Sequence, residues 1–215
     1  SGPLMEYATL REYLNTKVKK VLWIYYEGND LSGLKDEKIN NILINYLKDL
    51  DFTQNLKSKQ NDIDSFLLNL IKEKKVERER EIERNTFKPK LIKFIKIFNT
   101  RLLISSKLRP AAESSIPEFK QILKLTRELV NKNNSKLYFV YLPTYYRYTK
   151  TYDNTNYNLV KSIVTELKIP FIDMHKEVFE KEQNPLKLFP FELFGHYTID
   201  GYKKVAETTY KFTKD

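Results

Sequence analysis

Three short runs of apolar residues are each closed by polar or turn-forming residues, and this pattern predicts buried parallel strands. The runs cover residues 18–26, 137–142 and 171–172. Apolar residues recur at helical spacing ahead of each run and again near the end of the chain, over residues 4–14, 119–130, 159–167 and 200–211. Because helices and strands alternate, the pattern predicts an α/β fold with a parallel sheet and helices on both faces.

A long stretch without strand character separates the first run from the helix that precedes the second. Residues 37–50 and 61–84 have helical patterns, Lys88-Pro89 interrupts them, and residues 91–104 continue as a basic amphipathic helix. Such a helix can bind a membrane surface or a partner. Packing on the core is the simpler interpretation. The sequence therefore predicts one domain, residues 1–215, with a helical insertion over residues 37–104.

Composition narrows the possible functions. The chain has 215 residues, 41% hydrophobic content and a formal charge of +10, and no window approaches the roughly 18 apolar residues of a membrane span. Acidic residues are mixed among the lysines, so we expect a solvated surface and no nucleic-acid partner. There is no cysteine, which excludes disulfides and cysteine-based zinc sites. We expect no metal and no cofactor, and the compartment stays open.

Two local motifs could carry chemistry. Asn29 and Asp30 follow the first predicted strand, at the edge where open α/β sheets bind ligands. The Asn29 amide could stabilise an oxyanion and Asp30 could contact substrate, although Gly28-Asn29-Asp30 is also ordinary turn chemistry. His196 opens the last predicted helix, where it could act as a general base or only cap and pack. We interpret the other histidine, His175, as a surface residue.

Taken together and in this order, the motifs resemble the SGNH (GDSL-like) hydrolases, including their O-acetyltransferase and carbohydrate esterase branches. Residues 23–31 (WIYYEGNDL) resemble the third sequence block of that family, and residues 195–207 (GHYTIDGYKKVAE) resemble the fifth. Residues 1–4 (SGPL) resemble the tail of the second block, and KLYFVYLP and IPFIDM match the remaining strands. The resemblance implies a three-layer αβα, flavodoxin-like fold with a parallel sheet.

The resemblance also assigns roles in acyl transfer by a serine–histidine pair. His196 would be the general base, and the Asn29 amide and the Gly2 N–H would bind the oxyanion. The family often has an aspartate three residues before the histidine, where this chain has Leu193. Glu192, the preceding residue, could orient His196 instead.

The family's first block, which carries the nucleophilic serine in a Gly-Asp-Ser turn, has no counterpart in the chain. We therefore expect the fold to be incomplete at its N-terminal side and the chain to be catalytically incomplete. In the family's strand order, 2-1-3-4-5, the remaining strands form a three-stranded sheet whose strand 18–26 is an open edge. Such an edge is a template for pairing, and a homodimer through it is the expected partner arrangement.

The loop after the second predicted strand is rich in tyrosine. We expect Tyr145, Tyr146 and Arg147 to contact substrate, because aromatic and cationic side chains can stack on sugar rings, although an ordinary loop covering the next helix explains them equally well. The expected substrate is an acylated carbohydrate or a small ester. A non-catalytic carbohydrate- or partner-binding module on the same fold is the alternative.

Overall fold

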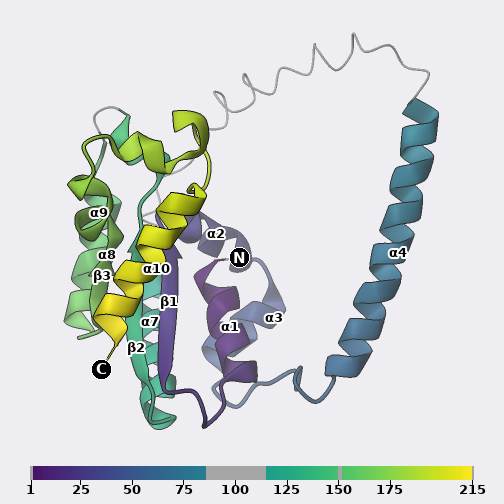
Figure 1. Cartoon of the computed structure of the whole chain (residues 1–215). Helices are drawn as coiled ribbons and strands as arrows, with labels where there is room; N and C mark the ends of the chain where they lie inside the picture. Colours follow the sequence, from purple (N-terminus) through teal and green to yellow (C-terminus); the bar gives the residue numbers. More distant parts are fainter. Residues whose placement is uncertain (1, 86–114, 150–151, 215) are drawn as a thin grey trace. The chain divides into compact units, whose positions relative to one another are not determined.

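The computed structural model describes residues 2–85, 115–149 and 152–214, with side chains of residues 81–85 left out (Figure 1). Contacts divide the chain into two units, one made of residues 1–52 with 112–215 and one of residues 53–111. The predicted amphipathic helix at 91–104 lies outside the described residues. The sheet, both sequence motifs and most helices belong to the first unit.

The first unit is built on three parallel strands, as the apolar runs predicted. The strands are β1 (Lys20–Tyr26), β2 (Lys136–Leu142) and β3 (Phe171–Asp173). Their order in the sheet is β1-β2-β3, with Lys20 opposite Lys136 and Phe139 opposite Phe171. The contiguous order and the position of β1 at an edge of the described sheet agree with the expectation from sequence.

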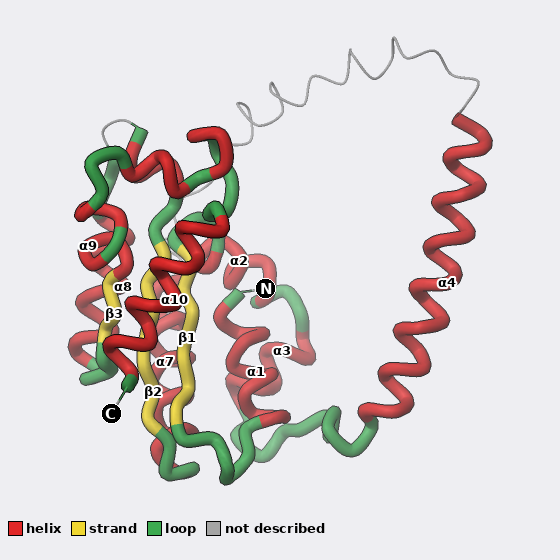
Figure 2. The backbone as a smooth tube through the Cα atoms, in the orientation of Figure 1, coloured by secondary structure: helices red, strands yellow, loops and turns green. Residues whose placement is uncertain are grey.

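Helices cover both faces of this sheet (Figure 2). Alternate residues of β2 point to opposite faces: Phe139 joins one buried apolar cluster and Val140 joins the other. The first cluster includes residues of α1 (Pro3–Tyr13), α7 (Ile116–Lys132) and α8 (Thr155–Glu166). The second is formed with α9 (Met174–Glu177) and α10 (Ile199–Thr213). The chain is thus a mixed α/β protein with a small parallel sheet.

The helix expected over residues 37–50 is shorter in the structure, where α3 spans Asn41–Lys48. The sequence pattern did not predict α2 (Asp30–Glu37), and a break at residues 38–40 separates it from α3. The break occurs because the Asn40 side chain accepts hydrogen bonds from the N–H groups of Ile42 (2.9 Å) and Leu43 (3.3 Å), which starts a new helix. Both helices pack against α1, so this stretch lies inside the first unit.

The helix expected over residues 200–211 is present as α10. Tyr202 and Tyr210 are 48% and 69% exposed, whereas Gly201 is buried. A Cβ atom at Gly201 would lie 2.9 Å from the Leu188 carbonyl oxygen. The close approach at this glycine holds the first turn of α10 against η4 (Pro185–Leu188).

The remaining elements are short, apart from one long helix. Among the described residues after β2 there are four 3-10 helices, η2 (Tyr145–Tyr148), η3 (Phe179–Lys181), η4 (Pro185–Leu188) and η5 (Pro190–Glu192). In the second unit, α4 (Gln60–Asn85) agrees with the helix expected over residues 61–84. None of the helices in the described ranges combines the length and apolar character that crossing a bilayer requires.

Candidate active site

Asn29 lies in an exposed turn at the carboxyl end of β1. Its N–H donates to the Tyr26 carbonyl (3.4 Å), and its own carbonyl accepts from Gly33 N–H (2.7 Å) and the Ser32 hydroxyl (2.8 Å). The main chain of Asn29 is therefore held by β1 on one side and by the first turn of α2 on the other. Its side chain makes no capping hydrogen bond to that helix. Asn29 is exposed, and its side chain is not used to cap α2.

His196 lies at the same end of β1. Its ring centroid is 5.5 Å from that of Tyr26, the last residue of the strand. The next residues fix this loop, because the Tyr197 hydroxyl donates to the Pro143 carbonyl (2.6 Å) and Thr198 N–H donates to the Leu188 carbonyl (2.8 Å). The structure thus brings His196 to the strand whose final carbonyl holds Asn29. Sequence reasoning did not single out Tyr26, the residue between them.

Gly2 does not offer a free N–H to an oxyanion. Its N–H donates to Glu37 Oε1 (2.6 Å), and Leu4 N–H donates to Glu37 Oε2 (2.9 Å). The first N–H groups of a helix have no partner within the helix, and at α1 the Glu37 side chain supplies one. A Cβ atom at Gly2 would lie 2.8 Å from Glu37 Oε2, so the glycine is needed for this close packing. The predicted oxyanion role of Gly2 is corrected accordingly.

The contacts of Glu192 differ from those expected of a residue that orients His196. Its carbonyl accepts from the Tyr145 hydroxyl (3.1 Å), and its carboxylate meets the Asn184 amide at 3.5 Å. Phe191 and Glu192 both have φ near +55°, a conformation that residues other than glycine rarely adopt. The carboxylate is directed by this unusual turn toward Asn184, so the orienting role expected of Glu192 has no support in the geometry.

Asp30 shapes the turn from inside the protein. It is buried, and its Oδ2 accepts a hydrogen bond from Tyr26 N–H (2.7 Å). Burial raises the pKa of Asp30 to about 7, against the opposing effect of that N–H donor, and nearby Glu37 adds to the rise. Asp30 is therefore a positioning residue for the turn, and the substrate contact expected of it is corrected.

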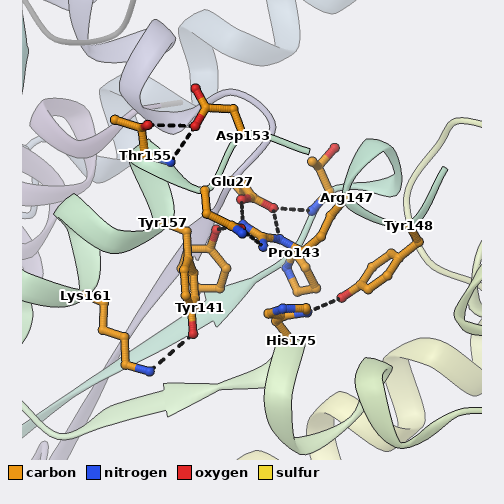
Figure 3. A network of polar contacts seen from close by, with 12 residues as sticks. Glu27, Tyr141, Pro143, Arg147, Tyr148, Asp153, Thr155, Tyr157, Lys161 and His175 are labelled. Atoms are coloured by element: carbon orange, nitrogen blue, oxygen red, sulfur yellow. Dashed lines mark hydrogen bonds and ion pairs between the residues drawn. The ribbon is translucent and has the colours of Figure 1, made fainter. Parts of the chain in front are cut away.

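A buried ion pair ties the turn after β1 to the loop after β2 (Figure 3). The side chains of Glu27 and Arg147 are 2% and 4% exposed, and Arg147 Nε donates to Glu27 Oε2 (3.0 Å) while its NH2 group contacts Oε1. Thr144 N–H donates to the same Oε2 (3.0 Å). The buried Glu27 carboxylate is therefore neutralised and hydrogen-bonded by the loop after β2.

Other side chains of the protein already bind the Arg147 guanidinium. NH1 donates to the Asn154 side chain (2.6 Å), NH2 lies 3.3 Å from the Tyr141 hydroxyl, and the group lies within 5 Å of the ring centroids of Tyr152 and Tyr157. Its predicted contact with substrate is corrected, because the donors are turned inward.

The two tyrosines of the same loop behave differently from each other. Tyr145 packs on Phe189, with 5.4 Å between ring centroids, and bonds the Glu192 carbonyl. Tyr146 is 49% exposed and stacks on the ring of Phe194, at 5.0 Å and an interplanar angle of 24°. Phe194, two residues before His196, is 54% exposed. Tyr146 and Phe194 therefore form an exposed aromatic pair.

His175 is buried, which corrects the surface position expected for it. Its Nδ1 lies 3.0 Å from the Tyr148 hydroxyl and its Nε2 lies 3.1 Å from Glu180 (Figure 3 shows the tyrosine contact). Burial, together with the positive charge of Arg147, lowers the pKa of His175. The nearby Asp173 carboxylate accepts from the Tyr157 hydroxyl at 2.5 Å. His175 is thus part of a packed polar network.

Comparisons of the chain with protein-family models, with curated proteins and with solved structures found no match. Within the described ranges, no group of three or more histidine, aspartate and glutamate side chains is arranged to hold a metal ion.

Proposed function

We propose that this chain carries two of the acyl-transfer groups of an SGNH-type ester hydrolase or O-acyltransferase domain, in which Asn29 binds the oxyanion and His196 acts as the general base, while the nucleophile has no counterpart among its assigned residues. One observation supports the proposal above all. Tyr26, at the carboxyl end of β1, contacts the His196 ring and accepts the main-chain N–H of Asn29. Two motifs that lie more than half the chain apart thereby reach the same edge of a parallel sheet, where such folds bind ligands.

The chemistry would follow from these two side chains. An imidazole near neutral pH can accept the proton of a hydroxyl nucleophile as it attacks an ester carbonyl. The Asn29 amide can then donate to the oxygen that becomes negative, which typically contributes a factor of ~10²–10³ in rate. The nucleophile itself is not identified. Ser32 lies close to Asn29 in sequence, but its hydroxyl donates to the Asn29 main-chain carbonyl.

The substrate class within the proposal is an acylated carbohydrate. The exposed pair Tyr146 and Phe194 supports it, because flat aromatic faces stack on sugar rings and Phe194 lies two residues before the candidate base in the sequence. The same pair favours a second candidate function, a carbohydrate-binding module that keeps the fold without the chemistry. The two functions differ in whether the acyl group is recognised.

Recognition of the acyl group can be measured by NMR titration. We expect methyl 6-O-acetyl-glucoside to shift the side-chain signals of Asn29 and His196 with one dissociation constant, while the deacetylated glucoside leaves them unchanged. Asn29→Ala should remove the response of His196, and Asn131→Ala, an exposed change on α7, should preserve it. An equal response to both sugars would instead support the binding module, and no response to either would contradict both functions.

Turnover of p-nitrophenyl acetate tests whether the chain contains a nucleophile. We expect the wild-type chain to hydrolyse this ester no faster than His196→Ala, because no serine has been assigned to the attack step. His175→Ala is the matched histidine control. Activity that disappears in His196→Ala and persists in His175→Ala would show that a nucleophile in the chain had been overlooked.

A further inference from the structure

The edge of β1 that faces away from β2 presents main-chain groups without a strand partner. Glu27 N–H donates to the Leu142 carbonyl (3.0 Å) and Lys136 N–H donates to the Lys19 carbonyl (2.9 Å). Bonding residues alternate along a parallel ladder, so the odd-numbered residues of β1 bond β2 and the even-numbered ones, including Leu22 and Ile24, face the other way. Within the described part of the chain, no strand lies on that side.

Beyond Lys20, the side chains along this edge do not protect it against pairing. Residues 21–26 (VLWIYY) contain no charge and no proline, and Leu22 and Ile24 are 42% and 43% exposed. Exposed edges in natural proteins are normally blocked by charges, prolines or bulges. An uncharged edge of this kind is suited to accept another strand.

A groove follows the same edge. A cavity of about 560 Å³ lies between α1 and the start of β1, and a second of about 210 Å³ continues along β1 as far as Ile24. Glu6, Leu10 and Val21 line both. Figure 2 shows α1 beside β1, on the side opposite β2. The helix therefore provides a wall against which one face of an added strand could pack.

Glu6 gives the groove a specific polar feature. Burial raises the pKa of Glu6 to about 8, and the nearby carboxyl groups of Asp30 and Glu37 raise it further. The other side chains shared by the two cavities are apolar. A lysine or arginine on an incoming strand would meet this carboxyl group in a partly desolvated setting, where an opposite charge has a strong effect.

We propose that β1 and α1 form an acceptor groove for one extended peptide segment, which adds to the sheet through Leu22 and Ile24 and places a cationic side chain opposite Glu6. This is strand addition, in which main-chain bonds give affinity and alternate side chains give specificity. The homodimer expected from sequence fits less well. If two copies paired β1 with β1 about a two-fold axis, the α1 helices of both copies would lie on the same face of the joined sheet. Each α1 would then occupy the groove of the other copy.

The test uses the whole chain and a soluble seven-residue probe, acetyl-Thr-Val-Lys-Val-Thr-Val-Thr-amide. Trp23, the chain's only tryptophan, lines the smaller cavity, so its fluorescence reports binding directly. We expect a saturable fluorescence change, with slowed hydrogen exchange at the Leu22 and Ile24 amides. Glu6→Gln should weaken this peptide and leave a peptide with threonine in place of lysine unaffected.

Ile24→Pro is the decisive variant. Proline removes the N–H that faces the groove and leaves the bonds to β2 intact, whereas Ile24→Ala keeps that N–H. We expect about a 10-fold loss of peptide affinity for proline relative to alanine, as for one or two lost hydrogen bonds. If Ile24→Pro does not fold, peptides N-methylated at alternate residues test the same bonds on the wild type.

Three results would overturn the proposal. The first is equal peptide binding by Ile24→Pro and Ile24→Ala, or by methylated and unmethylated peptides. The second is protection of the Leu22 and Ile24 amides in the chain alone at every concentration, which would mean that the chain fills its own groove. The third is protection that grows with protein concentration without peptide, which would assign the edge to a second copy.

Discussion

Arg147→Met is expected to lower the free energy of unfolding by about 3–5 kcal/mol, because it leaves the buried Glu27 carboxylate without its counter-charge. Glu27 is 2% exposed at its side chain, so water cannot replace the guanidinium. The donors left to the carboxylate, such as Thr144 N–H, carry no charge. Urea denaturation followed by far-ultraviolet circular dichroism measures the change.

Two controls separate the lost charge from lost packing. The double variant Glu27→Met with Arg147→Met removes both charges, and we expect it to recover most of the lost stability, since apolar replacements of a buried pair are often neutral or stabilising. Lys120→Met breaks an ion pair with Glu166 whose side chains are 44% and 59% exposed, and it should change stability by less than about 1 kcal/mol. A double variant no more stable than Arg147→Met would contradict the argument.

Stability is also expected to fall between pH 5 and pH 8 through Glu6 and Asp30. Burial raises the pKa of Glu6 to about 8 and that of Asp30 to about 7, whereas both carboxyl groups titrate near pH 4 in an unfolded chain. The folded state therefore holds protons that the unfolded state has released over this range. The contribution of these two groups to the stability of the folded state is fully present below about pH 4 and is lost as the pH rises through their folded pKa values.

The variant Glu6→Gln isolates one of the two groups. His175, whose pKa burial lowers, acts in the opposite direction, so the useful quantity is the difference between variant and wild type. We expect that difference to move in favour of Glu6→Gln by about 2 kcal/mol or more from pH 5 to pH 8, after allowance for partial exposure of the side chain. A constant difference across the range would show that Glu6 titrates normally.

Local pattern predicted the framework of the sheet well. Short apolar runs closed by turn residues identify β1, β2 and β3, because a buried parallel strand is apolar on both faces. The same pattern failed at α2, whose sequence DLSGLKDE has few apolar residues and a glycine. The signal for the helix break was Asn40, which sequence reasoning passed over although asparagine is a preferred capping residue.

Contacts between distant residues account for most of the errors at the candidate site. Nothing near Arg147 in the sequence indicates that Glu27 will neutralise it, and nothing near His175 indicates Tyr148 as its partner. Gly2 was placed correctly near a helix start, but the acceptor for its N–H comes from Glu37. A single sequence shows which groups can react, and the tertiary fold decides which of them are already paired.

The ion pair between Glu27 and Arg147 has an evolutionary consequence. The two positions lie 120 residues apart and in different loops, yet a neutral residue at either one strands a buried charge at the other. Descendants of this sequence can therefore pass between charged and uncharged versions of the pair only by a double change or through a destabilised intermediate. Changes at Glu27, in the loop that carries Asn29, are therefore expected to be accompanied by changes at Arg147, in the tyrosine-rich loop.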